Sequence, residues 1–382
     1  MDFTLPETGT DVATLARDIA TKVSTSDRVA ELETTGAPID ADLWRELGAA
    51  GLLGLELASA DLGDAGGDLT AIENLAVAEQ LGRVLARVPF GPHAIAAAPV
   101  IARRADTDLR ASLLGRSATG ETVLTVAFEE DLGVEPTSPT TTLTARDGGH
   151  IVSGTKVDVP YASAADVFLV NVIGPDGARV VVIRSDDPGV TVTDTRTTGL
   201  TPTAQLELVD VAVGDDRLLS GGSDAITDVA DRLTLAICAD QSGAVQRALE
   251  LTAEYARERE QFGKPIGSFQ AVAQRLADGY IDAQGLKLTT TQATWLLSRT
   301  EVDGPDEVDG DLATAIQTAK FWATEAGHRV AHTAVHVHGG VGLDTSHPVH
   351  RYFLRAKQNE FALGSAPITL RRIGRVLAAQ PV

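Results

Sequence analysis

The chain is organised around Tyr255-Ala-Arg-Glu-Arg-Glu-Gln-Phe-Gly-Lys-Pro-Ile-Gly-Ser-Phe-Gln270, which ends one long helix and begins another. Before it, residues 233–260 carry apolar side chains at helical spacing, which predicts a helix. Gly263 and Pro265 then break that helix. Arg259 stands at the break, where a guanidinium beside free backbone N–H groups makes a good pyrophosphate site. The alternative is a plain helical hairpin with a solvated, charged end.

The composition predicts a folded globular chain with an acidic surface. Of 382 residues, 43% are hydrophobic, and 32 Lys and Arg stand against 53 Asp and Glu, for a net charge of −21. Such a surface should repel nucleic acid and anionic membranes, so an anionic substrate would need local basic residues. Cys238 is the only cysteine, which excludes an internal disulfide and suggests a small core residue.

The N-terminal residues have neither a basic region nor an apolar run, so no signal peptide is expected. No stretch reaches about 18 uninterrupted apolar residues, so no membrane-spanning segment is expected either. A cytoplasmic protein is the simplest interpretation.

The pattern of periodicities predicts an α+β, mainly α chain in three domains. Residues 1–118 read as a helical N-terminal domain, 119–222 as a central antiparallel β domain, and 223–382 as a C-terminal four-helix bundle. Expected strands lie at 122–128, 140–145, 150–152, 167–172 and 178–183. Expected bundle helices lie at about 225–260, 267–300, 311–338 and 346–378.

Two motifs resemble signatures of the acyl-CoA dehydrogenase family. The first is Arg-Glu-Arg-x-x-Phe-Gly-x-Pro-Ile-x-x-Phe-Gln within the stretch quoted above, and the second is His336-Val-His-Gly-Gly-Val-Gly342. The resemblance runs from about Asp40 to Arg372. It implies the same three-domain architecture and an FAD cofactor that lies between the β domain and the bundle, with a neighbouring subunit supplying part of its site.

Carried over by position, the resemblance implies cofactor-binding roles for both motifs. Arg259 and Phe262 would contact the pyrophosphate and adenine side of the flavin. His336, Gly339 and Gly340 would contact the adenosine end of a flavin bound to the partner, and glycines there allow close backbone approach. The family usually has Gln where this chain has His336, and both side chains donate and accept hydrogen bonds. A plain helix-to-helix turn is the alternative reading of the glycines.

The family chemistry is α,β-dehydrogenation of an acyl-CoA, in which a carboxylate removes the α-proton while a hydride leaves to the flavin. The matching segment here runs from Arg355 to Ser365, with Leu363 in the place of the usual glutamate and Ser365 in that of a threonine. The resemblance thus implies that Ser365 contacts the cofactor. The backbone N–H of Leu363 could still polarise a thioester carbonyl.

A second position that the family uses for its base falls on Leu233, which is also apolar. Asp240 lies two turns further on nearly the same helix face, among apolar residues. An isolated Asp there costs stability unless it is paired or protonated, so Asp240 is the best candidate base. Its alternative role is an Asp bonded to a neighbouring Ser, Arg or backbone group. Asp231, near the helix start, is a poorer second candidate.

The β domain departs from the family where direct flavin contacts are expected. The loop at 127–133 reads Ala-Phe-Glu-Glu-Asp-Leu-Gly instead of the usual Thr-Glu-Pro-x-x-Gly-Ser. The strand that often carries a Trp reads Val157-Asp-Val-Pro-Tyr161, so Tyr161 could shield the flavin ring.

Three histidines, His328, His332 and His336, share one helical face at i, i+4 and i+8. This spacing could bind a transition metal, but no Cys or carboxylate completes the set at a matching spacing. A polar face near a phosphate-bearing ligand is preferred, and no metal is predicted.

Three functions remain open on the sequence. The first is an active FAD-dependent acyl-CoA dehydrogenase with Asp240 as base. The second is a non-catalytic subunit that completes the FAD site of a related partner, as in actinobacterial-type heteromeric enzymes that often act on steroid side-chain CoA thioesters. The third is a binding or structural protein without flavin. Expected partners are an acyl-CoA substrate, an identical or related subunit, and an electron-transfer flavoprotein.

Association is expected through the bundle, because its long helices carry apolar residues on more than one face. Examples on one predicted helix are Leu286, Leu288, Trp295 and Leu296. One chain is not expected to bury them all.

Overall fold

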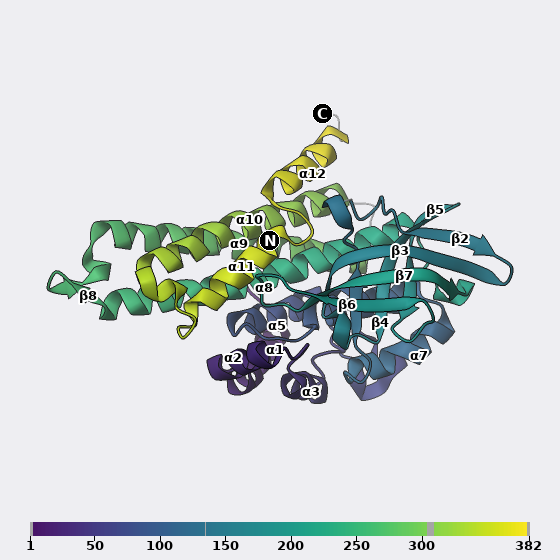
Figure 1. Cartoon of the computed structure of the whole chain (residues 1–382), viewed down its shortest axis with the longest axis horizontal. Helices are drawn as coiled ribbons and strands as arrows, with labels where there is room; N and C mark the ends of the chain where they lie inside the picture. Colours follow the sequence, from purple (N-terminus) through teal and green to yellow (C-terminus); the bar gives the residue numbers. More distant parts are fainter. Residues whose placement is uncertain (1–2, 134, 304–308, 380–382) are drawn as a thin grey trace.

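A computed structural model describes residues 3–133, 135–303 and 309–379. An N-terminal group of helices and a long helical bundle meet a central sheet (Figure 1). Asp40 accepts a hydrogen bond from the N–H of Leu43 and so caps the start of its helix. The N-terminal helices are α1 (Glu7–Val23), α2 (Ser26–Thr35), α3 (Ala41–Ala49), α4 (Ser59–Leu62), α5 (Ala71–Arg83), the π-helix η2 (Gly91–Ala97), α6 (Ala98–Arg104) and α7 (Thr107–Ala118).

The central sheet has the strand order β1-β4-β2-β3-β7-β6, with β5 also paired to β4. Most pairs are antiparallel as predicted, but both β1 and β2 pair with β4 in parallel. The two strands after 183 were not predicted individually, although β7 alternates apolar and polar residues along its length. The strands are β1 (Leu124–Ala127), β2 (Thr142–Arg146), β3 (Gly149–Pro160), β4 (Val167–Gly174), β5 (Gly177–Arg184), β6 (Val190–Thr195) and β7 (Thr203–Val213).

The bundle is formed by helices α8 to α11, and the hairpin of β8 (Glu260–Gln261) and β9 (Lys264–Pro265) joins the first two. This hairpin forms the end of the bundle that lies furthest from the sheet (Figure 1). The bundle helices are α8 (Ser223–Glu258), α9 (Gln270–Asp303), α10 (Asp309–His338) and α11 (Val349–Phe361).

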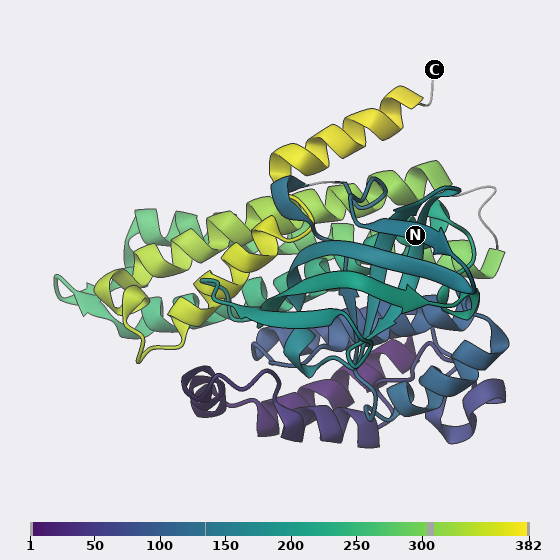
Figure 2. The same ribbon diagram turned by 45° about the vertical axis from the view of Figure 1, so that its right-hand side comes forward.

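The predicted last helix at 346–378 is two helices, which is a correction to the sequence interpretation. After α11 the chain turns at Leu363 (φ 55°) and Gly364 (φ 113°), and α12 (Ala366–Ala379) begins in a new direction. In both ribbon views α12 leaves α11 at an angle (Figures 1 and 2), and it packs against α10. Left-handed backbone angles cannot continue a right-handed helix, and the helical periodicity on either side hid this break.

Helix α8 connects the three parts of the molecule, because α5 packs along it on one side and the bundle helices on the other. The α5–α8 crossing is close enough to require glycine on both helices. A Cβ added at Gly82 would lie 2.3 Å from the carbonyl oxygen of Asp240, and one at Gly243 would lie 2.0 Å from that of Glu79. Cys238 is buried beside this crossing, as predicted for a core residue.

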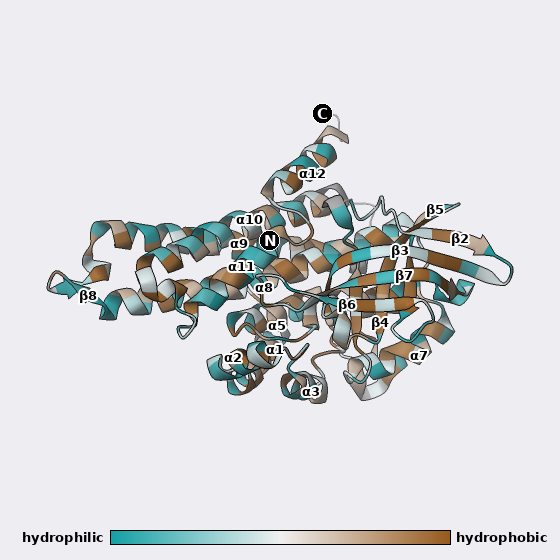
Figure 3. Ribbon diagram, in the orientation of Figure 1, coloured by the Kyte–Doolittle hydropathy of each residue, from teal (hydrophilic) through white to brown (hydrophobic). Residues whose placement is uncertain are grey.

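Apolar colouring gathers where the elements of the sheet and bundle face one another, whereas the β8–β9 hairpin is hydrophilic (Figure 3). Some large apolar side chains remain on the surface of α9, including Tyr280, Ile281 and Leu288, while Leu286 is fully buried within the chain. This outer face of α9 is consistent with association through the bundle. No described helix is long and apolar enough to cross a membrane.

The glycine crossing yields a stability prediction. Gly243→Ala should lower the free energy of unfolding by roughly 1–3 kcal/mol, because its new methyl group meets backbone that cannot move freely. The matched control is Gly115→Ala in α7, where an added Cβ meets nothing within 4 Å. The control should be neutral or gain up to about 1 kcal/mol from helix propensity. Chemical denaturation of both variants checks this, and equal effects would refute the tight crossing.

Candidate functional site

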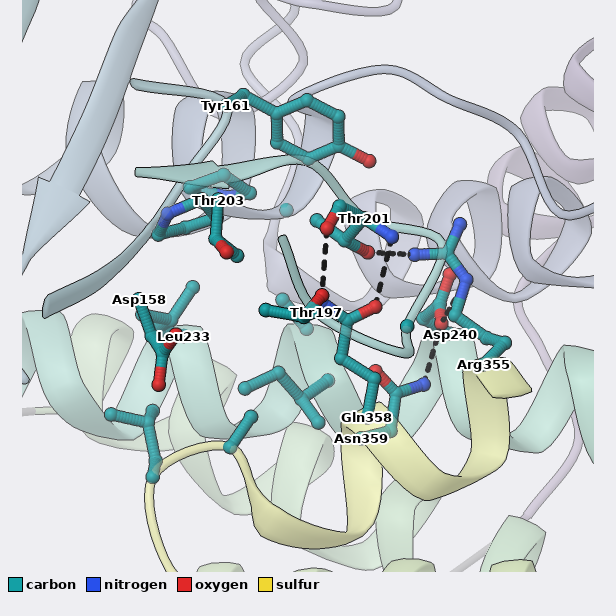
Figure 4. Close-up of a pocket in the computed structure, with 18 of the residues that line it drawn as sticks. Asp158, Tyr161, Thr197, Thr201, Thr203, Leu233, Asp240, Arg355, Gln358 and Asn359 are labelled. Atoms are coloured by element: carbon teal, nitrogen blue, oxygen red, sulfur yellow. Dashed lines mark hydrogen bonds and ion pairs between the residues drawn. The ribbon is translucent and has the colours of Figure 1, made fainter. Parts of the chain in front are cut away.

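A cavity of about 580 Å³ lies where the sheet meets the bundle. Its walls are mainly apolar and come from α5, the end of β1, α8, α11 and the loop between β6 and β7. Figure 4 shows polar side chains that interrupt this lining, namely Asp158, Thr201, Asp240, Arg355, Gln358 and Asn359. Glu129 also lines the cavity.

Asp240, the predicted base, lies in the cavity wall with 23% of its side chain exposed. Its Oδ2 accepts a hydrogen bond of 2.7 Å from the Nδ2 of Asn359, and the Nε of Arg355 lies 3.6 Å from the same atom. Asp240 and its partners gather on one side of the cavity, opposite Asp158 (Figure 4). The sequence left a paired Asp as the alternative to a base, and in the structure Asp240 is paired with both Asn359 and Arg355.

Arg355 is buried and holds three parts of the chain together. Besides facing Asp240, it donates to the carbonyl oxygen of Ala86 (3.0 Å) and to the hydroxyl of Thr201. Burial alone would lower the pKa of Arg355, but Asp240 and Tyr161 together outweigh this effect and raise the pKa. Gln358 bonds both backbone groups of Thr201, so α11 fixes the β6–β7 loop as one wall of the cavity.

Glu129 is an acidic side chain in the same cavity that the sequence did not single out. Its Oε1 accepts a hydrogen bond of 2.8 Å from the backbone N–H of Leu363. Burial raises the pKa of Glu129 against the effect of this bond, and the nearby Asp158 carboxylate raises it further. Leu363 itself is buried beside the cavity and places an apolar side chain where the family's usual base would stand.

Strand β3, which carries Asp158 and ends one residue before Tyr161, is irregular where it reaches the cavity. The pairing of β3 with β7 shifts register between Lys156 and Val159, and both Asp158 (φ 49°) and Tyr161 (φ 54°) have left-handed backbone angles. A bulge of this kind re-aims side chains next to a site. Tyr161 is buried in the cavity wall, where it was expected to shield a ring.

The predicted cofactor residues Arg259 and Phe262 lie far from this cavity, in the β8–β9 hairpin at the other end of α8. Phe262 is 93% exposed and contacts Phe269 edge-on. The exposed guanidinium of Arg259 has no ion pair or hydrogen bond to any residue that the structure describes. The predicted helix break lies here, although α8 ends at Glu258 instead of residue 260.

The second motif lies at the same end of the bundle. His336 is exposed near the end of α10, and Gly339 and Gly340 follow in a short 3₁₀ turn. A Cβ added at either glycine would meet nothing within 4 Å, so the surface there is open. The ring of His338 stacks on Tyr255 of α8 at 4.4 Å, which ties the α10 end to the hairpin.

These residues fit part of an FAD site: a free guanidinium for a pyrophosphate, an exposed aromatic ring and open backbone at glycines. Arg259 follows Asp240 by 19 residues on one helix, or about 28 Å along its axis. We call the surface formed by Arg259, Phe262, His336, Gly339 and Gly340 the far end. The far end and the cavity therefore cannot hold neighbouring atoms of one ligand.

The remaining sequence candidates fall outside both places or at their margin. Leu233 lines the cavity as an apolar residue, whereas Asp231 does not line it, and burial raises the pKa of Asp231 to about 7. Ser365 also lies outside the lining, two residues beyond Leu363. The rings of His328 and His332 lie 4.3 Å apart, and no metal-binding group of three or more His, Cys, Asp or Glu occurs among the described residues.

The cavity residues that sequence reasoning missed are Glu129, Arg355 and Asn359. Arg355 and Asn359 stood in the segment aligned for the missing base, and helical spacing places them on one face of α11. For Glu129 the sequence carried no signal, because its bond to Leu363 joins residues that are 234 positions apart.

Both ends of the chain match a known protein family. Residues 6–121 match the N-terminal domain of acyl-CoA dehydrogenases, and residues 221–378 match their C-terminal domain. The chain is 45% identical over 385 residues to the acyl-CoA dehydrogenase FadE27 of Mycobacterium tuberculosis, covering 100% of both chains.

Two solved structures are similar over the whole fold. A chain of the ChsE4-ChsE5 complex from Mycobacterium tuberculosis is 44% identical, with a TM-score of 0.92 and 100% coverage of both chains. A chain of a variant of the Tcur3481-Tcur3483 steroid ACAD is 38% identical with a TM-score of 0.89, covering 98% of this chain and 99% of that one.

The environment of Glu129 makes stability depend on pH. Because its pKa is raised in the fold, stability is lost as the pH rises through that value and the buried group becomes charged. Glu129→Gln should therefore be more stable than the parent at pH 8, by about 1 kcal/mol, which for a chain of 382 residues is roughly 1 °C in Tm. The gain should shrink toward pH 4. Exposed Glu207→Gln is the control, and thermal unfolding at both pH values tests the sign.

Proposed function

The chain belongs to the acyl-CoA dehydrogenase family, and we propose that it serves in it as a supporting subunit that completes the FAD site of a related partner chain. Members of this family use FAD to oxidise the CH–CH bond beside the carbonyl of an acyl-CoA thioester. The partner would hold the flavin ring and the thioester, and this chain would hold the phosphate and adenosine end of the same cofactor.

One observation carries the proposal: the far end has the features of a ligand site, but it lies too far from this chain's own cavity for a ligand to bridge neighbouring atoms of both. The guanidinium of Arg259 is exposed and has no polar partner in the described structure, and Phe262 is 93% exposed. An aromatic ring that projects so far from its own chain favours a contact with another molecule. The cavity about 28 Å away along α8 has apolar residues at both family base positions, Leu233 and Leu363.

The residues of the far end have distinct tasks in this function. The planar guanidinium of Arg259 can donate two parallel hydrogen bonds to phosphate oxygens. Phe262 offers an aromatic face for a base, and Gly339 and Gly340 leave room for a ligand against the backbone. His336 supplies a donor and an acceptor on the same surface. The bound FAD would supply the hydride acceptor, and no residue of the far end takes part in the proton transfer.

The assembly and substrate belong to the same proposal. Since the similar solved structures are of a ChsE4-ChsE5 complex and of a steroid ACAD, we infer a related acyl-CoA dehydrogenase chain as partner and a steroid-derived acyl-CoA as substrate. The proposal also includes an electron-transfer flavoprotein as electron acceptor and a cytoplasmic location. The exposed apolar face of α9 is available for the association.

A second candidate function is dehydrogenation in this chain's own cavity with Asp240 as base. The observation that favours it is the position of Asp240, whose carboxylate lies in the wall of a cavity large enough for an acyl group. In that function Asn359 and Arg355 would orient the carboxylate, and Ser365 would contact the cofactor.

The supporting role predicts an effect of Arg259→Ala on the partner's flavin. In the co-expressed assembly the variant should bind FAD about 10- to 150-fold more weakly, because it loses charge-assisted hydrogen bonds worth roughly 1.5–3 kcal/mol. Its folding should be unchanged. Arg146→Ala, an exposed arginine at the sheet, is the charge-matched control. FAD titration by visible absorbance measures the loss, and equal retention by both variants would show Arg259 to be misassigned.

Asp240→Asn separates the two candidate functions, because it keeps the size of the side chain and removes the base. If this chain only supports its partner, substrate should reduce the flavin of the assembly that contains the variant at the parental rate. Own catalysis would instead give a loss on the order of 10²–10⁴ with the flavin still bound. Stopped-flow absorbance of flavin reduction in the assembly decides between these outcomes.

A further inference from the structure

The backbone donor at Leu363 is already occupied within the chain. The turn after α11 gives Leu363 a φ of 55° and Gly364 a φ of 113°, and the Leu363 N–H donates to the Oε1 of Glu129 at 2.8 Å. The carbonyl of Leu363 is also held, by the Nη1 of Arg372 at 2.7 Å. This donor is the one that the sequence offered to a ligand carbonyl, so Glu129 stands where such a carbonyl would bind.

Glu129 is held in this position by its neighbours. Its carbonyl oxygen accepts from the N–H of Val157, which joins the loop after β1 to β3. The next residue, Glu130, is fixed by the Nζ of Lys156 and by the backbone of Thr140 and Thr141. Because the loop is anchored through Glu130, the Glu129 side chain has little freedom to leave the cavity wall.

The position of Glu129 is costly for the fold. Within the described structure its side chain has one hydrogen-bond donor and no ion pair. The two cations whose charge acts on Glu129 are engaged elsewhere: Lys320 donates to the carbonyl of Asn359 (2.6 Å), and Arg372 to Glu135 (2.9 Å). A carboxylate that is surrounded by protein and has so few hydrogen bonds and ion pairs lowers the stability of the fold. A role in stabilising the fold is therefore a poor explanation for the presence of Glu129 here.

The charge around Glu129 also opposes anionic ligands. Asp158 and Asp240 line the same cavity, and the cation on its wall nearest to Asp240, Arg355, is shared among that carboxylate, Ala86 and Thr201. A flavin dinucleotide or a CoA thioester would bring further negative charge without a free cation to meet it. In this respect the cavity residues do not fit FAD, in contrast to the far end.

We propose that the Glu129 side chain is a built-in occupant of the cavity, which takes the Leu363 N–H and so excludes ligands that need this donor, such as a flavin ring or a thioester carbonyl. The inference deepens the proposed function, because a supporting subunit requires no ligand in its own cavity. It also argues against Glu129 as a base here, since the carboxylate consumes the donor that a developing enolate needs.

The test uses lumiflavin, an isoalloxazine ring without ribityl or phosphate, as the probe. Its carbonyl groups can accept the Leu363 N–H, and it needs no contact with the far end of a second chain. Fluorescence titration of the full chain should give a Kd for Glu129→Ala at least about tenfold lower than for the parent. Glu129→Gln should stay near the parent, because its amide oxygen still accepts from Leu363. Glu207→Ala, an exposed glutamate of β7, is the control.

Circular dichroism first establishes that Glu129→Ala is folded, and Glu129→Thr, also too short to reach Leu363, replaces it if not. Three results would each overturn the proposal. The parent could bind lumiflavin as tightly as the shortened variant, or the shortened variant could bind it no more tightly than Glu207→Ala. The Kd of Glu129→Gln could also fall as far as that of Glu129→Ala. None of these results bears on Arg259, whose effect is measured on the partner's flavin, so the two proposals can fail separately.

Discussion

The rigidity of one continuous helix sets the geometry on which the rest of this structure depends. Helix α8 runs unbroken for 36 residues, and its hydrogen-bonded backbone fixes the spacing of everything mounted on it. Asp240 faces the cavity near its middle, and Arg259 ends it at the hairpin. Close packing at Gly82 and Gly243 holds α8 against α5, so bending cannot bring the two places together. The cavity and the far end, both mounted on α8, must therefore serve two different ligands or contribute to two halves of a shared site.

The two surfaces differ in their chemistry as well as their position. Among the described residues, the far end offers an arginine side chain without a polar partner, an exposed ring and open glycines. The cavity has paired several of its polar groups internally: Asp240 with Asn359 and Arg355, and the Leu363 N–H with Glu129. A surface with free donors is prepared for binding, whereas a cavity with paired donors must first break bonds. This contrast supports a chain that contributes to a neighbour's site more than to its own.

Much of this was predictable from the sequence, for reasons that can be stated residue by residue. The break after Arg259 and the glycines at 339–340 are local signals, and the three-part architecture follows from changes in hydrophobic period. The turn at Leu363 was missed, although Gly364 and Pro367 after it are local signals of a helix end, because the helical periodicity on both sides outweighed them. The Asp240 and Glu129 contacts come from α11 and the turn after it, far along the chain. Such pairings depend on tertiary packing, which periodicity does not report.

The central claim is that the far end of this chain contacts a flavin held by another chain. The most direct measurement is photolabelling of the assembled enzyme with FAD that carries an azide on its adenine, followed by peptide mapping. We expect adducts on this chain within residues 255–270 or 336–343, and only when the partner is present. Adducts confined to the partner, or to the cavity segments of this chain, would contradict the account.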